Sequence, residues 1–203
     1  MLQADQPPLV LASASAARRA LLAAAGLRFE AVAADIDEAA IREREREAGR
    51  HAGQAALALA FAKAASVADR RPDAVVIGAD QILVCDGAWF DKPADLAQAR
   101  AQLCRLRGRE HVLTTGLVLL RGTDVLLQHL AQPRLTLRAF SDAFLDEYLR
   151  AEGTGVLGSV GCYRLEGLGL LLFDAVEGEH GAILGLPMLG LLRGLRVVGL
   201  LTT

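Results

Sequence analysis

An aspartate and a lysine near the middle of the chain are of the right types to act together on a phosphate. Asp80 follows the apolar run 75–77 and the glycine Gly78, and Lys92 comes shortly afterwards. A carboxylate can hold a metal ion or a water molecule, and an ammonium group neutralises phosphate oxygens. The alternative is a surface ion pair beside a hairpin, and for a lone pair this alternative is favoured, so other segments must decide.

The apolar run predicts the central strand that positions Asp80. Residues 75–77 are all β-branched, as in strands buried on both faces, and the strand is expected to stop at residues 78–81. In open α/β sheets, ligands bind at the carboxyl ends of strands, which predicts a crevice at Asp80. Gly78 lets other backbone or a ligand come close. A turn signal at Asp86 then predicts a hairpin that returns the chain toward Asp80.

The start of the chain has the order of a strand, a serine turn and a helix. The strand is predicted at 9–11, and the alanine- and leucine-rich helix ends just before Gly26. Ser13 or Ser15 can cap this helix, whose first amide groups form an anion site.

Two arginines, Arg18 and Arg19, lie near the start of the same helix, where the helix dipole disfavours cations. A triphosphate in the serine turn would explain Arg18, because a guanidinium forms charge-assisted hydrogen bonds with phosphate. Two solvated arginines on an ordinary amphipathic helix are the alternative.

Further charged residues lie between the first helix and Asp80. Asp37 and Glu38 are either ligands of a metal or water, or the acidic start of a helix. Residues 42–50 have no apolar face and predict a solvated segment that is free to move. Lys63 lies among small residues in a helix predicted at 55–69. It either extends along the surface with its charge in water or reaches into the crevice.

The rest of the chain predicts an α/β fold without an internal repeat. A glycine-rich stretch at 158–169 carries Glu166. Two further helices are predicted at 96–106 and 143–151, and further strands at 111–120, 125–130 and 134–138. The 203 residues suffice for one large domain or two small lobes.

The composition excludes several classes of protein. A net charge of −2 gives no electrostatic reason to bind polymeric nucleic acid. The three scattered cysteines argue against a disulfide framework or a zinc ribbon and favour a reducing cytosol. Residues 181–201 are very apolar, but Pro187, Arg193 and Arg196 favour a buried helix and a closing strand over a membrane span. Asp5 opposes a signal peptide.

Seven fragments together carry a specific resemblance. In chain order they are LASASAARRALL, FAKA, IGADQ, DKP, HVLTTG, YRLEGLG and ILGLP. With them the chain closely resembles the Maf family of nucleoside triphosphate pyrophosphatases over nearly its whole length. The resemblance implies an elongated mixed-sheet α/β fold, related to the inosine triphosphatases, with two lobes around a central crevice in one domain spanning residues 1–203. It also implies a cytoplasmic homodimer that depends on Mg²⁺ or Mn²⁺.

The family's reaction is hydrolysis of a nucleoside triphosphate between the α and β phosphates. By the resemblance, Asp80 is the base and shares the metal with Glu38. The residues implied to bind the phosphates are Ser13, Ser15, Arg18, Lys63 and Lys92. The alternative is a nucleotide-binding regulator of septum formation with little turnover, but Asp80, Lys63 and Lys92 together favour catalysis.

Three positions are implied to select the base. Gln81 and Glu166 resemble the branch of the family that acts on 7-methyl-GTP. The branch acting on dTTP and UTP carries Arg, Thr and Gln at these three positions. Ala17, at the first of them, matches neither branch. The sequence therefore predicts 7-methyl-GTP as substrate, with dTTP or UTP as the alternative.

Overall fold

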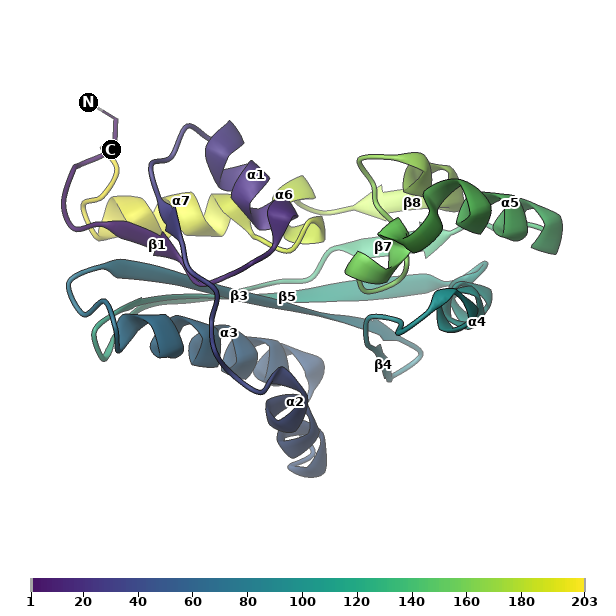
Figure 1. Cartoon of the computed structure of the whole chain (residues 1–203), viewed down its shortest axis with the longest axis horizontal. Coiled ribbons are helices and arrows are strands. Elements are labelled where there is room, and N and C mark those ends of the chain that lie inside the picture. The colour runs from purple at the N-terminus through teal and green to yellow at the C-terminus, as the bar shows by residue number, and fades with distance from the viewer. Residues whose placement is uncertain (1, 203) are drawn as a thin grey trace. The chain divides into compact units, whose positions relative to one another are not determined.

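A computed structural model describes residues 2–202, which form a mixed α/β fold of eight strands and seven α-helices (Figure 1). The chain divides into two compact units. The first comprises residues up to Gln81, Thr115–Ala131 and the residues from Glu179 onward, and the second comprises Ile82–Thr114 and Gln132–Gly178. The predicted α/β class is confirmed. The single domain with a central cleft stays a prediction.

The first unit contains a mixed sheet. In it β1 (Leu9–Leu11) lies parallel to β2 (Glu30–Ala31) and to the start of β3 (Val75–Cys85). The end of β5 (Glu110–Arg121) pairs antiparallel with β6 (Asp124–Ala131). The β-branched run at the start of β3 is fully buried, as its composition predicts.

Helices cover both faces of this sheet. Side chains alternate along a strand, so neighbouring residues of β1 and β3 enter different cores. Leu11 and Ile77 pack on the side of α1 (Ala16–Ala24) and α7 (Met188–Val197). Val76 packs on the opposite side, against α3 (Ala52–Ala68). Figure 1 shows α1 and α7 on one face of this sheet and α3 on the other.

Two glycines let α3 lie directly on the sheet. A Cβ atom at Gly78 would be 2.0 Å from the carbonyl oxygen of Ala60, and one at Gly116 would be 2.7 Å from that of Ala56. No side chain fits in these spaces. The backbone of α3 therefore makes the close approach predicted at Gly78. This contact sets the distance between α3 and β3.

We expect the substitution Gly78→Ala to destabilise the protein by about 1–3 kcal/mol or more, because the new methyl group must push α3 away from β3. Urea unfolding measures the change. Gly158→Ala is the control, since a Cβ there meets no atom within 4 Å. Equal stability of the two variants would contradict the close packing of α3.

The second unit contains the predicted hairpin. The end of β3 pairs antiparallel with β4 (Ala88–Phe90). Asp86 and Gly87 form its turn with φ angles of 49° and 76°, a conformation that suits these residue types. In the same unit, β7 (Arg134–Leu137) lies between the start of β5 and β8 (Phe173–Glu177).

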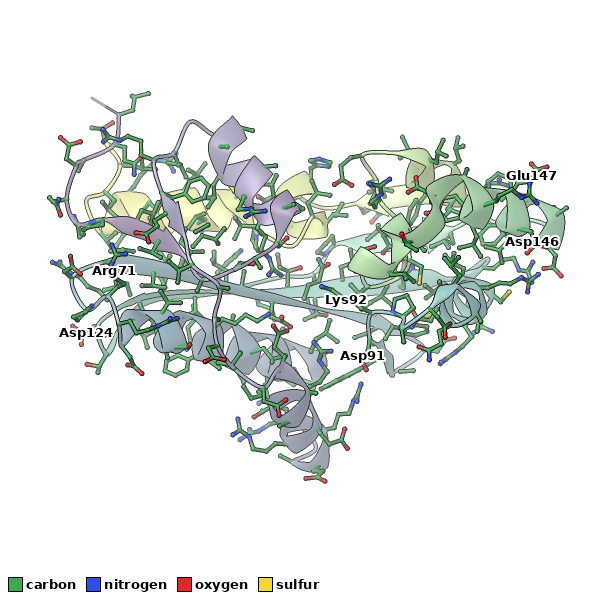
Figure 2. All side chains as sticks on the ribbon, viewed as in Figure 1. Arg71, Asp91, Lys92, Asp124, Asp146 and Glu147 are labelled. Atoms are coloured by element: carbon green, nitrogen blue, oxygen red, sulfur yellow. The ribbon has the colours of Figure 1, made fainter. Side chains whose placement is uncertain are left out.

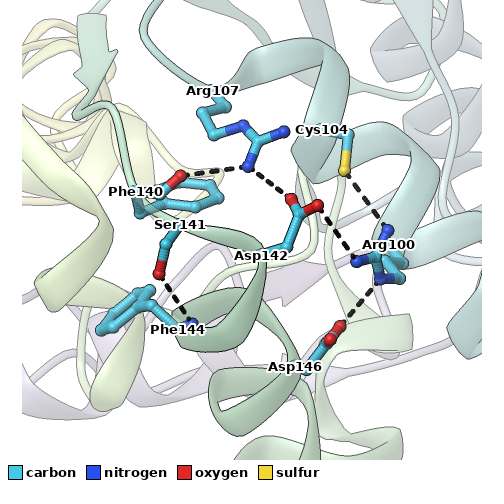
Figure 3. A network of polar contacts seen from close by, with 8 residues as sticks. All are labelled: Arg100, Cys104, Arg107, Phe140, Ser141, Asp142, Phe144 and Asp146. Carbon is cyan, nitrogen blue, oxygen red and sulfur yellow. Dashed lines mark hydrogen bonds and ion pairs between the residues drawn. The ribbon is translucent and has the colours of Figure 1, made fainter.

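Charged side chains join α4 (Leu96–Leu106) to α5 (Asp142–Glu152) in the second unit (Figure 3). Arg107 Nη1 lies 2.7 Å from Asp142 Oδ1, and Arg100 Nε lies 2.8 Å from Asp146 Oδ1. The hydrogen bond and charge of Arg107 lower the pKa of Asp142. These exposed pairs align the two helices and contribute little stability.

A buried polar pair lies in the second unit. His111 Nε2 and the hydroxyl of Tyr163 are 2.7 Å apart, and the ring of Tyr163 meets that of Phe173 edge-on. Burial lowers the pKa of His111 to about 4. The imidazole is therefore neutral at physiological pH and acts as part of the core.

The structure corrects the predicted end of the central strand. β3 continues through Asp80 to Cys85, so the carboxylate projects from the middle of a strand. The reason is the second apolar run after Gln81, which extends the strand and pairs with β4. Asp80 is accordingly held by hydrogen-bonded backbone on both sides.

Most of the charged segment at 42–50 lies in helix α2 (Glu38–Glu47), none of whose residues is buried, so the prediction of a solvated segment is confirmed. Its freedom to move stays a prediction. The side chain of Asp37 caps the helix by accepting a hydrogen bond from the amide of Ala40. Arginine and glutamate have high helix propensities, which favour this helix although it has no apolar face. Asp37 and Glu38 thus form the acidic start of a helix, and the role of metal or water ligand stays a prediction for them.

The C-terminal part forms two helices, α6 (His180–Ile183) and α7. The predicted closing strand is wrong for the residues described up to 202: after α7, Leu201 makes an isolated bridge with Gln3. Within residues 2–202, no helix is long and apolar enough to cross a membrane.

Candidate active site

A buried ion pair forms the centre of the candidate site in the first unit. Asp80 on β3 and Lys63 on α3 are 4% and 6% exposed. Lys63 Nζ donates to Asp80 Oδ1 at 2.6 Å and lies 2.9 Å from Glu38 Oε2 at the start of α2. Lys63 therefore points into the protein toward Asp80. The sequence had left open whether its side chain extends along the surface or points inward.

The second oxygen of Asp80 is held less tightly. Asp80 Oδ2 is buried and accepts no hydrogen bond from the residues that the structure describes. A guanidinium nitrogen of Arg42, Nη2, lies 3.6 Å away. The proximity of Arg42 to Asp80 was not predicted from the sequence. The available signal was its spacing of four residues from Glu38, which places both side chains on one face of a helix.

The serine turn at the start of α1 holds Arg18. Ser15 caps the helix by accepting a hydrogen bond from the amide of Arg18 at 3.3 Å. Ser13 Oγ accepts hydrogen bonds from the Ser15 amide at 3.1 Å and from Arg18 Nη1 at 3.3 Å. Arg18 Nε donates to the carbonyl of Gly185 at 2.7 Å. Arg18 is therefore fixed in place, unlike its exposed neighbour Arg19.

The charge of Arg18 belongs to the same centre. Burial lowers the pKa of its half-buried guanidinium, while the nearby carboxylates of Asp80 and Glu38 raise it. An arginine kept charged in a polar turn, at the amino end of a helix, is suited to an anion. The structure thus brings together Ser13, Ser15, Arg18, Glu38, Lys63 and Asp80.

Replacing Arg18 should therefore matter far more than replacing Arg19. We expect Arg18→Ala to lower kcat/KM for a nucleotide by about 10- to 100-fold, as the loss of one ionic hydrogen bond predicts. Arg19→Ala is the matched control and should change it little. Steady-state kinetics measure both. If both variants had similar, mild effects, Arg18 would only stabilise the serine turn and would not bind phosphate.

Gln81, next to Asp80, has its amide orientation fixed by the protein. Its Nε2 donates to the hydroxyl of Thr115 and to the carbonyl of Ala182, both at 2.9 Å, and lies 3.2 Å from the carbonyl of Ile183. Carbonyl oxygens can only accept, so the nitrogen must face them. The hydrogens of Nε2 are thereby committed to the protein, and Gln81 can offer a ligand only its acceptor oxygen.

Three predicted residues take part in none of the contacts described above. Ala17 is half-buried in the first turn of α1. Lys92 follows β4 in the second unit, after Asp91, as Figure 2 labels them. Glu166 is exposed, also in the second unit. The roles of these three residues stay predictions.

A metal ion at this site would rely on two carboxylates. Within residues 2–202 no group of three or more histidine, cysteine or acidic side chains is arranged to hold a metal. Asp80 and Glu38 nevertheless supply hard oxygen ligands, and Asp80 Oδ2 lacks a hydrogen-bond donor. Such a set fits Mg²⁺, which proteins bind by one or two carboxylates together with substrate phosphates.

Comparison with known proteins agrees with this geometry. The family model described as "Maf-like protein" matches residues 8–198. A nucleoside triphosphate pyrophosphatase of Granulibacter bethesdensis is 51% identical over 188 residues, 93% of this chain and 95% of its own. One from Gluconobacter oxydans is 51% identical over 189 residues, 93% of each chain. A 7-methyl-GTP pyrophosphatase of Rhizobium meliloti is 46% identical over 194 residues, 96% of this chain and 98% of its own.

Proposed function

Because the chain belongs to the Maf family, we propose that the centre around Asp80 hydrolyses a nucleoside triphosphate to its monophosphate and pyrophosphate. Relatives covering nearly the whole chain at about half identity are nucleoside triphosphate pyrophosphatases, and the chain is an enzyme of this class. The observation that carries the assignment to this site is the buried Asp80, contacted at 2.6 Å by Lys63.

In this mechanism Asp80 is the general base. Its Oδ2 accepts the proton of a water molecule, whose oxygen attacks phosphorus in the α–β anhydride while the P–O bond to the leaving group breaks. Oδ1 stays with Lys63, which fixes the carboxylate in one orientation. The serine turn and Arg18 bind the phosphates and hold the reacting phosphorus near Asp80.

Asp80 and Glu38 would hold Mg²⁺ or Mn²⁺ in the proposed complex. The ion would polarise phosphate oxygens and neutralise part of the charge of the triphosphate. Lys63, Arg18 and Lys92 would neutralise more of it, and phosphoryl transfer depends chiefly on such positioning and neutralisation.

The free cysteines among the described residues fit a reducing compartment, and we place the reaction in the cytoplasm.

A pyrophosphate-release assay over a panel of nucleoside triphosphates, with and without Mg²⁺, tests the proposed function. We expect Asp80→Asn to lower kcat by about 10²- to 10⁴-fold, because an amide cannot act as a base. Asp124→Asn, at the exposed start of β6 (Figure 2), is the control and should be fully active. A folded Asp80→Asn protein with normal turnover would refute the assignment. Nucleotide binding without turnover by the wild type would favour the regulator instead.

We propose 7-methyl-GTP as the preferred substrate. Methylation at N7 makes guanine cationic, so a carboxylate such as Glu166 attracts it, whereas thymine and uracil are neutral. At an effective dielectric constant near 20 and about 5 Å, the attraction is on the order of 3 kcal/mol before desolvation. The acceptor oxygen left to Gln81 also suits the N–H donors of guanine. The relative in Rhizobium meliloti is a 7-methyl-GTP pyrophosphatase.

Substrate preference is measured as kcat/KM for 7-methyl-GTP, GTP, dTTP and UTP. We expect the wild type to have its highest kcat/KM with 7-methyl-GTP. The variant Glu166→Gln should lower the ratio of this kcat/KM to that for the other nucleotides by about tenfold, because the Coulombic attraction is lost. Glu147→Gln, an exposed glutamate on α5 of the same unit (Figure 2), is the control. A higher kcat/KM of the wild type for dTTP or UTP would refute 7-methyl-GTP as the preferred substrate and support the pyrimidine nucleotides.

A further inference from the structure

Glu152, the last residue of α5 in the second unit, carries a shielded charge that the proposed reaction does not use. Its side chain is 2% exposed. Its Oε2 accepts hydrogen bonds from Nη2 of Arg164 at 2.6 Å and from Nε at 3.0 Å. Shielding a carboxylate from water is costly unless it is paired, so the contact with Arg164 is what makes this placement stable.

The pair packs against the turn that carries Glu166. The amide of Gly167 donates to the carbonyl of Arg164 at 3.2 Å, which closes a four-residue turn with Glu166 at its third position. A Cβ atom at Gly167 would lie 3.3 Å from Glu152 Oε1. Glu152 therefore contacts both the first and the last residue of this turn, while Glu166 is exposed to solvent.

Arg164 is a cation in the same turn as Glu166, so it can compete with a cationic base for that carboxylate. The hydrogen bond and charge of Glu152 are the main reasons why the pKa of Arg164 is raised, and the charge of Glu166 contributes less. The guanidinium is thus influenced by both carboxylates, but its hydrogen bonds go to Glu152. Two carboxylates and one guanidinium leave one negative charge for the base, whereas without the charge of Glu152 the three groups would be neutral overall.

We propose that Glu152 is a positioning residue for base selection, which holds the guanidinium of Arg164 away from Glu166 and so leaves the charge of Glu166 to the 7-methylguanine base. This inference rests on the proposed function and on 7-methyl-GTP as its substrate. Loss of the charge of Glu152 releases Arg164 to pair with Glu166 two residues away, and a paired carboxylate attracts a cationic base less. The alternative is that the pair of Glu152 and Arg164 only stabilises the turn.

The ratio of kcat/KM for 7-methyl-GTP to that for GTP measures this effect, because the two nucleotides differ only by the methyl group and its charge. We expect Glu152→Gln to lower the ratio by about three- to tenfold through the release of Arg164. The double variant Glu152→Gln/Arg164→Gln should keep the wild-type ratio to within about twofold, since no cation of the pair then competes for Glu166. Glu147→Gln, exposed on the same helix, is the matched control and should leave the ratio unchanged.

An unchanged ratio in folded Glu152→Gln would overturn the inference. An equal loss in the single and the double variant would also overturn it, because the pair would then act only through the shape of the turn. Circular dichroism establishes that each variant is folded. If Glu152→Gln is unfolded, the double variant retains the test, since it replaces the charged pair by two amides and a lowered ratio in it contradicts the proposal.

Pyrophosphate release by the wild type separates failure of this inference from failure of the proposals on which it rests. Its absence for every nucleotide would refute the proposed function, and turnover without a preference for 7-methyl-GTP over GTP would refute the proposed substrate. Turnover with that preference, unaltered by Glu152→Gln, would refute only the role of Glu152.

Discussion

The buried contact between Lys63 and Asp80 is the interaction on which the first unit depends. Two charges removed from water are tolerable only when they meet, and removing one partner of such a pair typically costs about 3–5 kcal/mol. The contact requires α3 to lie close to β3, which Gly78 and Gly116 permit. The same interaction therefore constrains the fold and prepares the carboxylate for chemistry, and a change that loosens the helix acts on both.

Local chemistry made part of the structure predictable. The helix at 96–106 was predicted with the bounds observed, and the hairpin follows from the turn signal at Asp86. The helix cap is Ser15, one of the two serines predicted for it. In each case the determining residues are neighbours in the sequence. The inward direction of Lys63 was only one of two open alternatives, because it is determined by Asp80 on another element.

The features that escaped prediction depend on distant partners. Asp80 was placed at the end of a strand, since nothing local shows that the following apolar run continues the same strand and pairs with β4. Arg42 was missed because its charged helix resembles a solvated segment until Asp80 is seen beside it. The pairing of Arg18 with Gly185 joins the two ends of the chain and has no local signal.

Residues 182–185, which span the end of α6 and the start of the turn before α7, orient residues of the site through their backbone carbonyl groups. The carbonyl groups of Ala182 and Ile183 fix Gln81, and that of Gly185 fixes Arg18. Carbonyl groups are present whatever the side chain, so these contacts do not themselves specify residue types, except at Gly185 with its φ of 94°. Ala182 and Ile183 are buried, so packing limits their replacement. An inserted or deleted residue would shift all three acceptors at once. The constraint that the site places on this segment is therefore one of length, separate from the constraint that packing places on its side chains.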